Sequence, residues 1–148
     1  MIQSTEYHYT PHPEERERAI NSYIMSLVVI MVGMPLPIIN LIASAIYYLG
    51  NMKASSFVKW HCVQVMVTQL FLFVINSIGF AWLMFIIFGS WEFSNYFFAY
   101  ILVLLAFNIS ELVGTIVSVF EIKKGKHPRW WLFADLTDLI MDEETKYA

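Results

Sequence analysis

The chain has 148 residues, of which 58% are hydrophobic types and 14% are charged, and its formal net charge is −3. A soluble domain carries about 25% charged residues, so a soluble globule is excluded and the long apolar stretches predict an integral membrane protein. The small negative charge gives no basic field for binding nucleic acid. Cys62 is the only cysteine, which excludes an internal disulfide and a cysteine-built metal cluster.

The first part of the chain, residues 1–19, is a polar N-terminal segment. It contains Glu6, Glu14 and Glu17 where a cleavable signal peptide would need a basic start. Pro13 followed by acidic residues predicts a helix start. We expect this helix to continue into a transmembrane helical domain, residues 20–122, followed by a basic junction and amphipathic tail, residues 123–148.

The first predicted span covers residues 21–49, which exceeds the roughly 20 apolar residues that cross a bilayer. Within it, the segment Gly33-Met34-Pro35-Leu36-Pro37 predicts a kink, because each proline removes a backbone donor and crowds the preceding turn. Gly50-Asn51 is typical of a helix end. We therefore expect one long, proline-kinked helix.

The second apolar block, residues 57–89, is too long for one upright span. Its first part mixes Lys59, Trp60 and His61 with apolar residues, which is typical of the headgroup zone. We expect an interfacial segment at 57–64 and a span at 65–88. After a turn, a third span follows at about 96–120.

The predicted fold class is therefore an all-α integral membrane protein with three transmembrane helices, the first kinked, and interfacial helices before the second span and at the C-terminus. A four-span alternative needs a turn within the second block, where the only turn-like residues are Asn76-Ser77-Ile78-Gly79. The tail Trp130–Met141 has leucines on one side and aspartates on another, which favours a helix lying along the headgroups.

The distribution of basic residues predicts the topology. Four of them follow the third span and would anchor it or bind anionic lipid headgroups: Lys123, Lys124, Lys126 and Arg129. The positive-inside bias then places the C-terminus in the cytoplasm and, with three spans, the N-terminus outside. Four spans would place both termini inside.

Glu111 falls near the middle of the third span, where a charged carboxylate costs about 2.5 kcal/mol or more. Three amides are expected at similar depth: Asn40, Asn76 and Asn108. The leading interpretation is a structural hydrogen-bonded network across the helices. The alternatives are a path for protons, ions or a substrate, and contact with a partner subunit.

Small residues recur on the third span at Ser110, Gly114 and Ser118, a stripe that lets another helix approach closely. The sequence contains no phosphate-binding loop, zinc motif or nucleophile elbow. We therefore expect no enzymatic activity, no metal site and no cofactor. A haem carrier is the least favoured alternative, because histidines are scarce in the apolar part.

Three pieces of sequence carry a resemblance to a known family. They are Pro37-Ile38-Ile39-Asn40-Leu41-Ile42-Ala43, the block from Phe57 to Gln64, and Gly125-Lys126. Together they resemble small bacterial membrane proteins related to the Tic translocon subunit of the chloroplast inner envelope. The resemblance implies a compact helical protein of the bacterial inner membrane, with signature positions Phe57, Lys59, His61 and Gln64.

Two functional hypotheses follow. The first is a non-enzymatic subunit or accessory factor of a larger membrane complex, whose partners are the lipid bilayer and other membrane proteins. The second is a transport or translocation element, with a polar path around Glu111.

Overall fold

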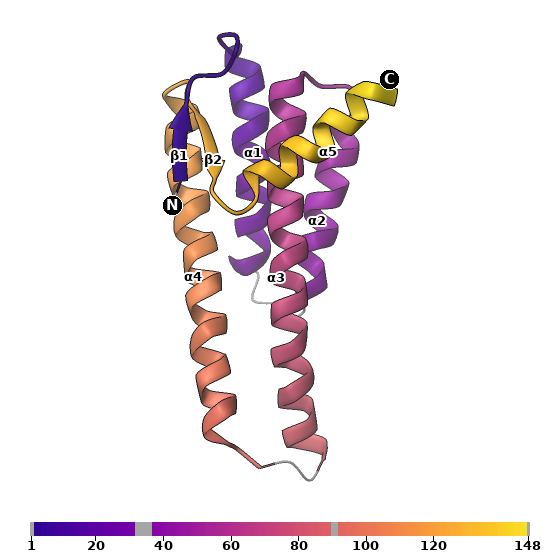
Figure 1. Cartoon of the computed structure of the whole chain (residues 1–148), viewed down its shortest axis with the longest axis vertical. Helices are drawn as coiled ribbons and strands as arrows, with labels where there is room; N and C mark the ends of the chain where they lie inside the picture. Colours follow the sequence, from indigo (N-terminus) through magenta and orange to yellow (C-terminus); the bar gives the residue numbers. More distant parts are fainter. Residues whose placement is uncertain (1, 32–36, 90–91, 148) are drawn as a thin grey trace.

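A computed structural model of the chain describes residues 2–31, 37–89 and 92–147, and the side chains of all of these except 28–31, 37 and 143–147. The elements are β1 (Ile2–Thr5), α1 (Pro13–Met31), α2 (Pro37–Gly50), α3 (Ser56–Phe88), α4 (Asn95–Lys123), β2 (His127–Trp130) and α5 (Ala134–Tyr147). Figure 1 shows α3 and α4 as two long antiparallel rods, with every other element gathered around their upper halves. We call this upper part, formed by β1, β2, α5 and the adjoining helix ends, the head.

Within the described parts of the chain, two helices are long and apolar enough to cross a membrane. They are α3, with a mean hydropathy of 2.4 in its most apolar stretch, and α4, with 2.0. Only 11% and 22% of these stretches are buried, whereas the core helix of a soluble protein would be mostly covered. The apolar side chains on their lower halves therefore face lipid, and the predicted helical membrane character is confirmed.

The prediction of three spans was wrong. The segment expected to be the first span forms two helices, with α1 ending at Met31 and α2 beginning at Pro37. The Tyr47 hydroxyl near the end of α2 donates to the Arg18 carbonyl near the start of α1, at 2.9 Å, so the two helices run antiparallel. At 14 residues, α2 is about 21 Å long and is too short to cross a bilayer core of about 30 Å.

The proline segment explains this difference. Proline is tolerated at the first position of a helix, where Pro37 stands in α2, and it disfavours helix in the residue before it. Pro37 is therefore suited to begin a new helix. The predicted kink itself falls on residues 32–36, outside the described residues.

The two predicted interfacial helices also need correction. Residues 57–64 are the first turns of α3, which continues unbroken to Phe88. At the other end, Trp130 belongs to strand β2 and the C-terminal helix begins at Ala134. The reason is a pairing that local sequence does not reveal: β2 runs antiparallel to β1, with Ile2 opposite Trp130 and Thr5 opposite His127.

A glycine turn sends the chain from α4 into β2. Gly125 has a φ of +80°, a conformation that residues with a side chain rarely adopt. Its N–H donates to the Ile122 carbonyl at 2.9 Å, and the Lys126 N–H donates to the Glu121 carbonyl at 3.0 Å. This is the Schellman arrangement of a helix C-terminus. It folds β2 back along α4, where Trp130 reaches Gly114.

The strand pairing places both ends of the chain at the same end of the molecule, so the expectation that the two termini lie on opposite sides of the membrane was wrong. No Lys or Arg occurs in residues 19–52 or 60–122, and the loop after α3 carries Glu92. All nine basic residues thus lie in the head or at the helix ends that join it. The positive-inside bias predicts that the head faces the cytoplasm. The predicted boundaries between the N-terminal segment, the transmembrane domain and the tail, at residues 19 and 122, remain a prediction. The head contains residues of all three segments.

Cysteine labelling tests this topology. We expect Glu17→Cys and Lys124→Cys, both exposed in the head, to react with a membrane-impermeant maleimide from the same side of sealed vesicles. Phe93→Cys, in the opposite loop, should react only from the other side. The unsubstituted protein supplies the background, because Cys62 is buried. Labelling of Glu17→Cys and Lys124→Cys from opposite sides would restore the three-span arrangement.

Candidate functional site

In the block from Phe57 to Gln64 at the start of α3, the polar side chains of His61 and Gln64 point into the head. Phe57, His61 and Gln64 recur at the spacing of one helix face, and all three are fully buried. Lys59 points elsewhere and is partly exposed. The block therefore forms the centre of the head and supplies its polar core.

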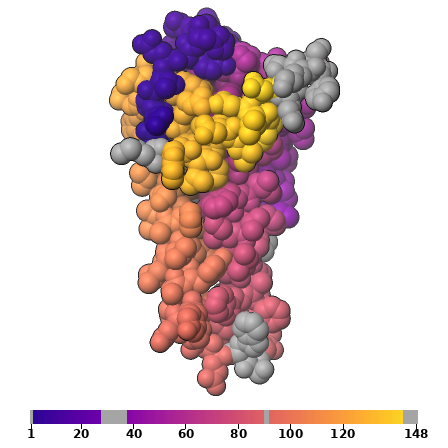
Figure 2. Space-filling model, viewed as in Figure 1, coloured from indigo at the N-terminus to yellow at the C-terminus, as the bar shows by residue number. Residues whose placement is uncertain are grey.

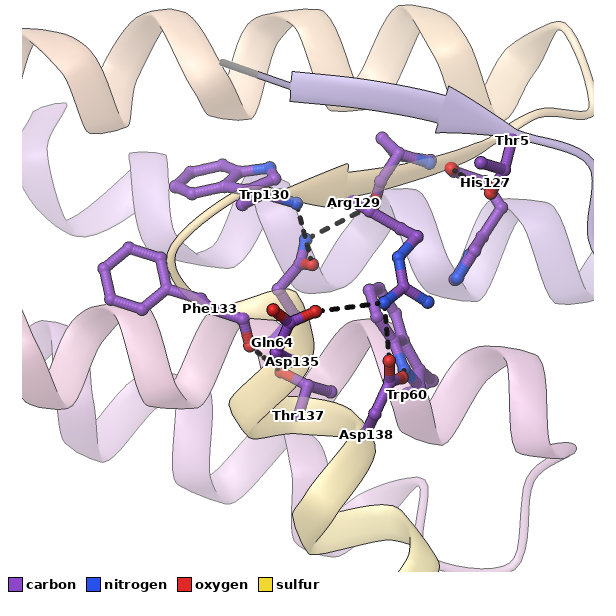
Figure 3. A network of polar contacts seen from close by, with 11 residues as sticks. Thr5, Trp60, Gln64, His127, Arg129, Trp130, Phe133, Asp135, Thr137 and Asp138 are labelled. Carbon is purple, nitrogen blue, oxygen red and sulfur yellow. Dashed lines mark hydrogen bonds and ion pairs between the residues drawn. The ribbon is translucent and has the colours of Figure 1, made fainter.

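Gln64 is the junction of this core. Its Nε2 donates to the Tyr23 hydroxyl of α1 at 2.7 Å, and the same nitrogen lies 3.5 Å from the Pro128 carbonyl. Its Oε1 accepts from the backbone N–H of Trp130 at 3.2 Å. Figure 3 shows the amide reaching from α3 to β2. One side chain thus fastens α1, α3 and β2 together.

Two histidines lie side by side next to this junction. His127 Nδ1 is 3.2 Å from His61 Nε2, and the Tyr23 hydroxyl is 3.0 Å from His61 Nδ1. Between the two facing nitrogens one must donate and the other accept, so a proton on both would break the bond. The pKa of His127 is lowered to about 4, chiefly by burial and also by the nearby Arg129 guanidinium, while Asp138 opposes the shift. His127 is therefore neutral at physiological pH.

The head surface above the histidines is polar. Trp60 Nε1 donates to Asp138 Oδ1 at 2.6 Å, and Arg129 pairs with Asp138 (Figure 3) while lying over the Trp60 ring at 5.7 Å from its centre. These groups border a surface cavity of about 490 Å³ that also includes Glu6 and His8. Among the described residues, no group of three or more His, Cys, Asp or Glu side chains is placed to hold a metal ion.

The polar groups of the membrane region are paired between α3 and α4. The amides of Asn76 and Asn108 bond to each other in both directions, at 3.3 and 2.9 Å. Closer to the head, Glu111 Oε1 accepts from Gln69 Nε2 at 2.8 Å and from Thr115 Oγ1 at 3.4 Å. None of the described hydrogen bonds joins Asn40, on α2, to either group.

Gln69, the partner of Glu111, was not predicted from the sequence. A signal was present, because Gln69 and Asn76 are seven residues apart and so share a face of α3. Tyr23, His127 and Trp130 were also not predicted as members of the polar core. No local signal marks these three, because their partners lie 38 to 66 residues away.

The small residues Gly114 and Ser118 of α4 pack against the indole ring of Trp130, whereas another helix was expected at this stripe. Trp130 Nε1 donates to Ser118 Oγ at 2.8 Å, and a Cβ added at Gly114 would meet the Trp130 ring at 2.9 Å. Ser110 is exposed. The backbone turn at Gly125 causes this, because it lays β2 on this face of α4.

The basic cluster after α4 is partly paired with acids. Lys124 and Lys126 both lie close to Glu121, at 3.0 and 3.5 Å, and Arg129 pairs with Asp135 and Asp138. The Lys123 carbonyl accepts from Arg16 at 3.4 Å. The role of these residues toward lipid headgroups remains a prediction.

A comparison with known families decides the relationship of the chain. The profile of the MamF/MmsF family, described as the magnetosome magnetite crystal formation protein family, matches residues 15–135. The chain belongs to this family. Its match covers most of the chain, from α1 into α5, and it corrects the expected relationship to the Tic translocon subunit. No curated protein and no solved structure shows detectable similarity to the chain.

The junction predicts a specific loss of stability in this MamF/MmsF protein. Gln64→Leu preserves the approximate volume but leaves the Trp130 N–H and the Tyr23 hydroxyl without this partner. Each unsatisfied buried group costs about 1–3 kcal/mol, so we expect a clearly lower thermal midpoint in detergent micelles, followed by circular dichroism. Gln3→Leu, on the exposed side of β1, is the matched control and should change the midpoint little. Equal midpoints for both variants would contradict the role of Gln64.

The low pKa of His127 predicts a pH dependence. Above about pH 6.5, the ordinary histidine pKa, His127 is neutral in both the folded and the unfolded chain, so it contributes no pH dependence to folding stability. As the pH falls from 6.5 toward 4, only the unfolded chain takes up the proton, so folding stability drops by up to about 3 kcal/mol.

This loss would be measured as the thermal midpoint at pH 7.5, 6 and 5. We expect His127→Asn to reduce the slope of the profile, with the remainder coming from the buried His61, and His12→Asn, which removes an exposed histidine, to leave the slope unchanged. A profile that keeps its slope in His127→Asn would contradict the assignment.

Proposed function

We propose that this protein is a non-enzymatic accessory subunit of a membrane complex that takes part in magnetite crystal formation at the magnetosome membrane. The observation that carries the proposal is the family match, which extends over both spans and most of the head. The proposed role is that of a scaffold, anchored by α3 and α4, that presents a rigid head on one side of the membrane.

The geometry of the polar groups supports a scaffold over a transport path. Asn76 and Asn108 satisfy each other's amides, and Glu111 is held by Gln69 and Thr115. Groups that bond to one another across two helices stabilise their packing, whereas a path requires groups that are free to bind what passes.

The surface of the head supports contact with partners. Trp131, Leu132, Leu136 and Leu139 are 46–68% exposed on and before α5, and Figure 2 shows this C-terminal region covering one face of the head. Exposed aromatic and aliphatic side chains next to charged ones are typical of binding surfaces and membrane interfaces.

Deletion of the encoding gene in a magnetosome-forming bacterium tests the proposal. We expect electron microscopy to show fewer or smaller magnetite crystals, restored by the wild-type protein and by the exposed-site control Gln3→Leu, and poorly restored by Gln64→Leu. Affinity purification in mild detergent should recover other membrane proteins in fixed ratio. Unchanged crystals in the deletion strain would contradict the role in crystal formation. A protein recovered alone would contradict the subunit role.

A further inference from the structure

A groove of about 560 Å³ runs between α3 and α4 beneath the head. Its walls include Phe71 and Leu72 of α3 and Phe107 of α4, and the segment 131–133 overhangs its upper end. The volume lies within the range of about 300–1,000 Å³ that is usual for small-molecule sites. In Figure 1 this segment, between β2 and α5, lies between the upper parts of α4 and α3, and in Figure 2 the C-terminal region covers the front of the molecule at that level.

The groove lies at the depth of the hydrocarbon core that adjoins the head. Trp131 and Leu132, on the overhang, are 68% and 59% exposed, and tryptophan is enriched at the membrane–water interface. Below the overhang, the groove opens between apolar side chains of both spans that face lipid, among them Ile109 and Val113. The groove therefore opens toward the bilayer and not toward water.

One polar side chain stands out in this apolar lining. Glu111 is only 4% exposed and borders the groove, while Gln69 and Thr115 bind its Oε1 and the Ser26 side chain of α1 lies beside its carboxyl group. No Lys or Arg occurs between residues 60 and 122 to balance a carboxylate. The cost of an unpaired charge at this depth keeps the group as a neutral acid, which has one hydrogen to donate.

We propose that the groove binds a membrane phospholipid, with one acyl chain along Phe71 and Phe107 and an ester carbonyl accepting a hydrogen bond from the Glu111 carboxylic acid. The depth of Glu111 agrees with this occupant, because Glu111 lies one helical turn below Gly114, which lies next to Trp130, and the following residue, Trp131, is the exposed tryptophan of the overhang. The apolar lining of the groove suits an acyl chain, and its one buried acid suits an ester carbonyl. The site is independent of the proposed role in crystal formation.

The first experiment measures retained lipid. The full-length protein would be extracted in mild detergent and its bound phospholipid counted by native mass spectrometry. We expect the wild type to retain one phospholipid, Ser110→Trp to lose it because the indole fills the groove, and Leu112→Trp to retain it. Leu112 lies on the same helix as Ser110 at a similar depth and is 38% exposed, but it does not line the groove.

A second pair of variants tests the hydrogen bond. Glu111→Gln keeps a donor of the same shape and should retain the lipid. Glu111→Leu keeps the volume without the donor, and we expect about fivefold weaker retention, which corresponds to one hydrogen bond. Circular dichroism of each variant establishes that it is folded.

A hydrophobic carbodiimide tests the state and access of the acid from the bilayer. The protonated carboxyl gives its proton to a carbodiimide nitrogen while its oxygen adds to the central carbon, and an acyl shift to nitrogen then leaves a stable adduct with no leaving group. After the bound lipid has been removed with detergent, we expect the adduct at Glu111 in the wild type and in Leu112→Trp, and its absence in Ser110→Trp and Glu111→Gln.

Three results would overturn the proposal. Equal lipid retention in Ser110→Trp and Leu112→Trp would place the lipid elsewhere. An adduct at Glu111 in a wild type that retains no lipid would show an open groove without this ligand. A dimer that Ser110→Trp dissociates and Leu112→Trp does not would assign the groove to a second copy of the chain.

Discussion

The amide of Gln64 joins three segments that are far apart in the chain, and the rest of the head is arranged around it. Its nitrogen binds Tyr23 of α1 and its oxygen binds the Trp130 backbone of β2. Buried amide groups must find partners, because an unpaired one costs free energy comparable to a lost hydrogen bond. Once Gln64 is buried at the start of α3, α1 and β2 are required beside it. The fixed geometry of this one side chain thus determines how the head closes.

The closed head determines the topology. The chain enters the head at β1, and the α1–α2 hairpin returns to it before α3 leaves for the other side of the membrane. Because β1 pairs with β2 after the return of α4, both termini lie on the same side. Two spans then suffice to anchor the protein, and the basic residues collect at one end. The asymmetry of charge is a consequence of this folding as much as a cause of orientation.

The membrane region follows a different rule from the head. Its polar side chains form two separate layers, Asn76 with Asn108 and Gln69 with Glu111, and each layer joins α3 to α4. In hydrocarbon the helices gain little from apolar contact alone, so hydrogen bonds and close packing hold them together. Glu111 differs from the amides because it also borders a lipid-facing groove. One acid can thus serve both the packing of the helices and the binding of a lipid.

The sequence alone determined the membrane character and both true spans, because composition and hydropathy are local properties. It did not determine the burial of Phe57, His61 and Gln64, since that block was expected in the headgroup zone. It did not determine that the first apolar stretch is a hairpin, since Pro35 and Pro37 are compatible with a kink as well as a break. Nor did it reveal the contacts of Gln64, His61 and Trp130. Those depend on β1 pairing with a strand more than 120 residues away, and only the tertiary structure brings such distant polar groups together.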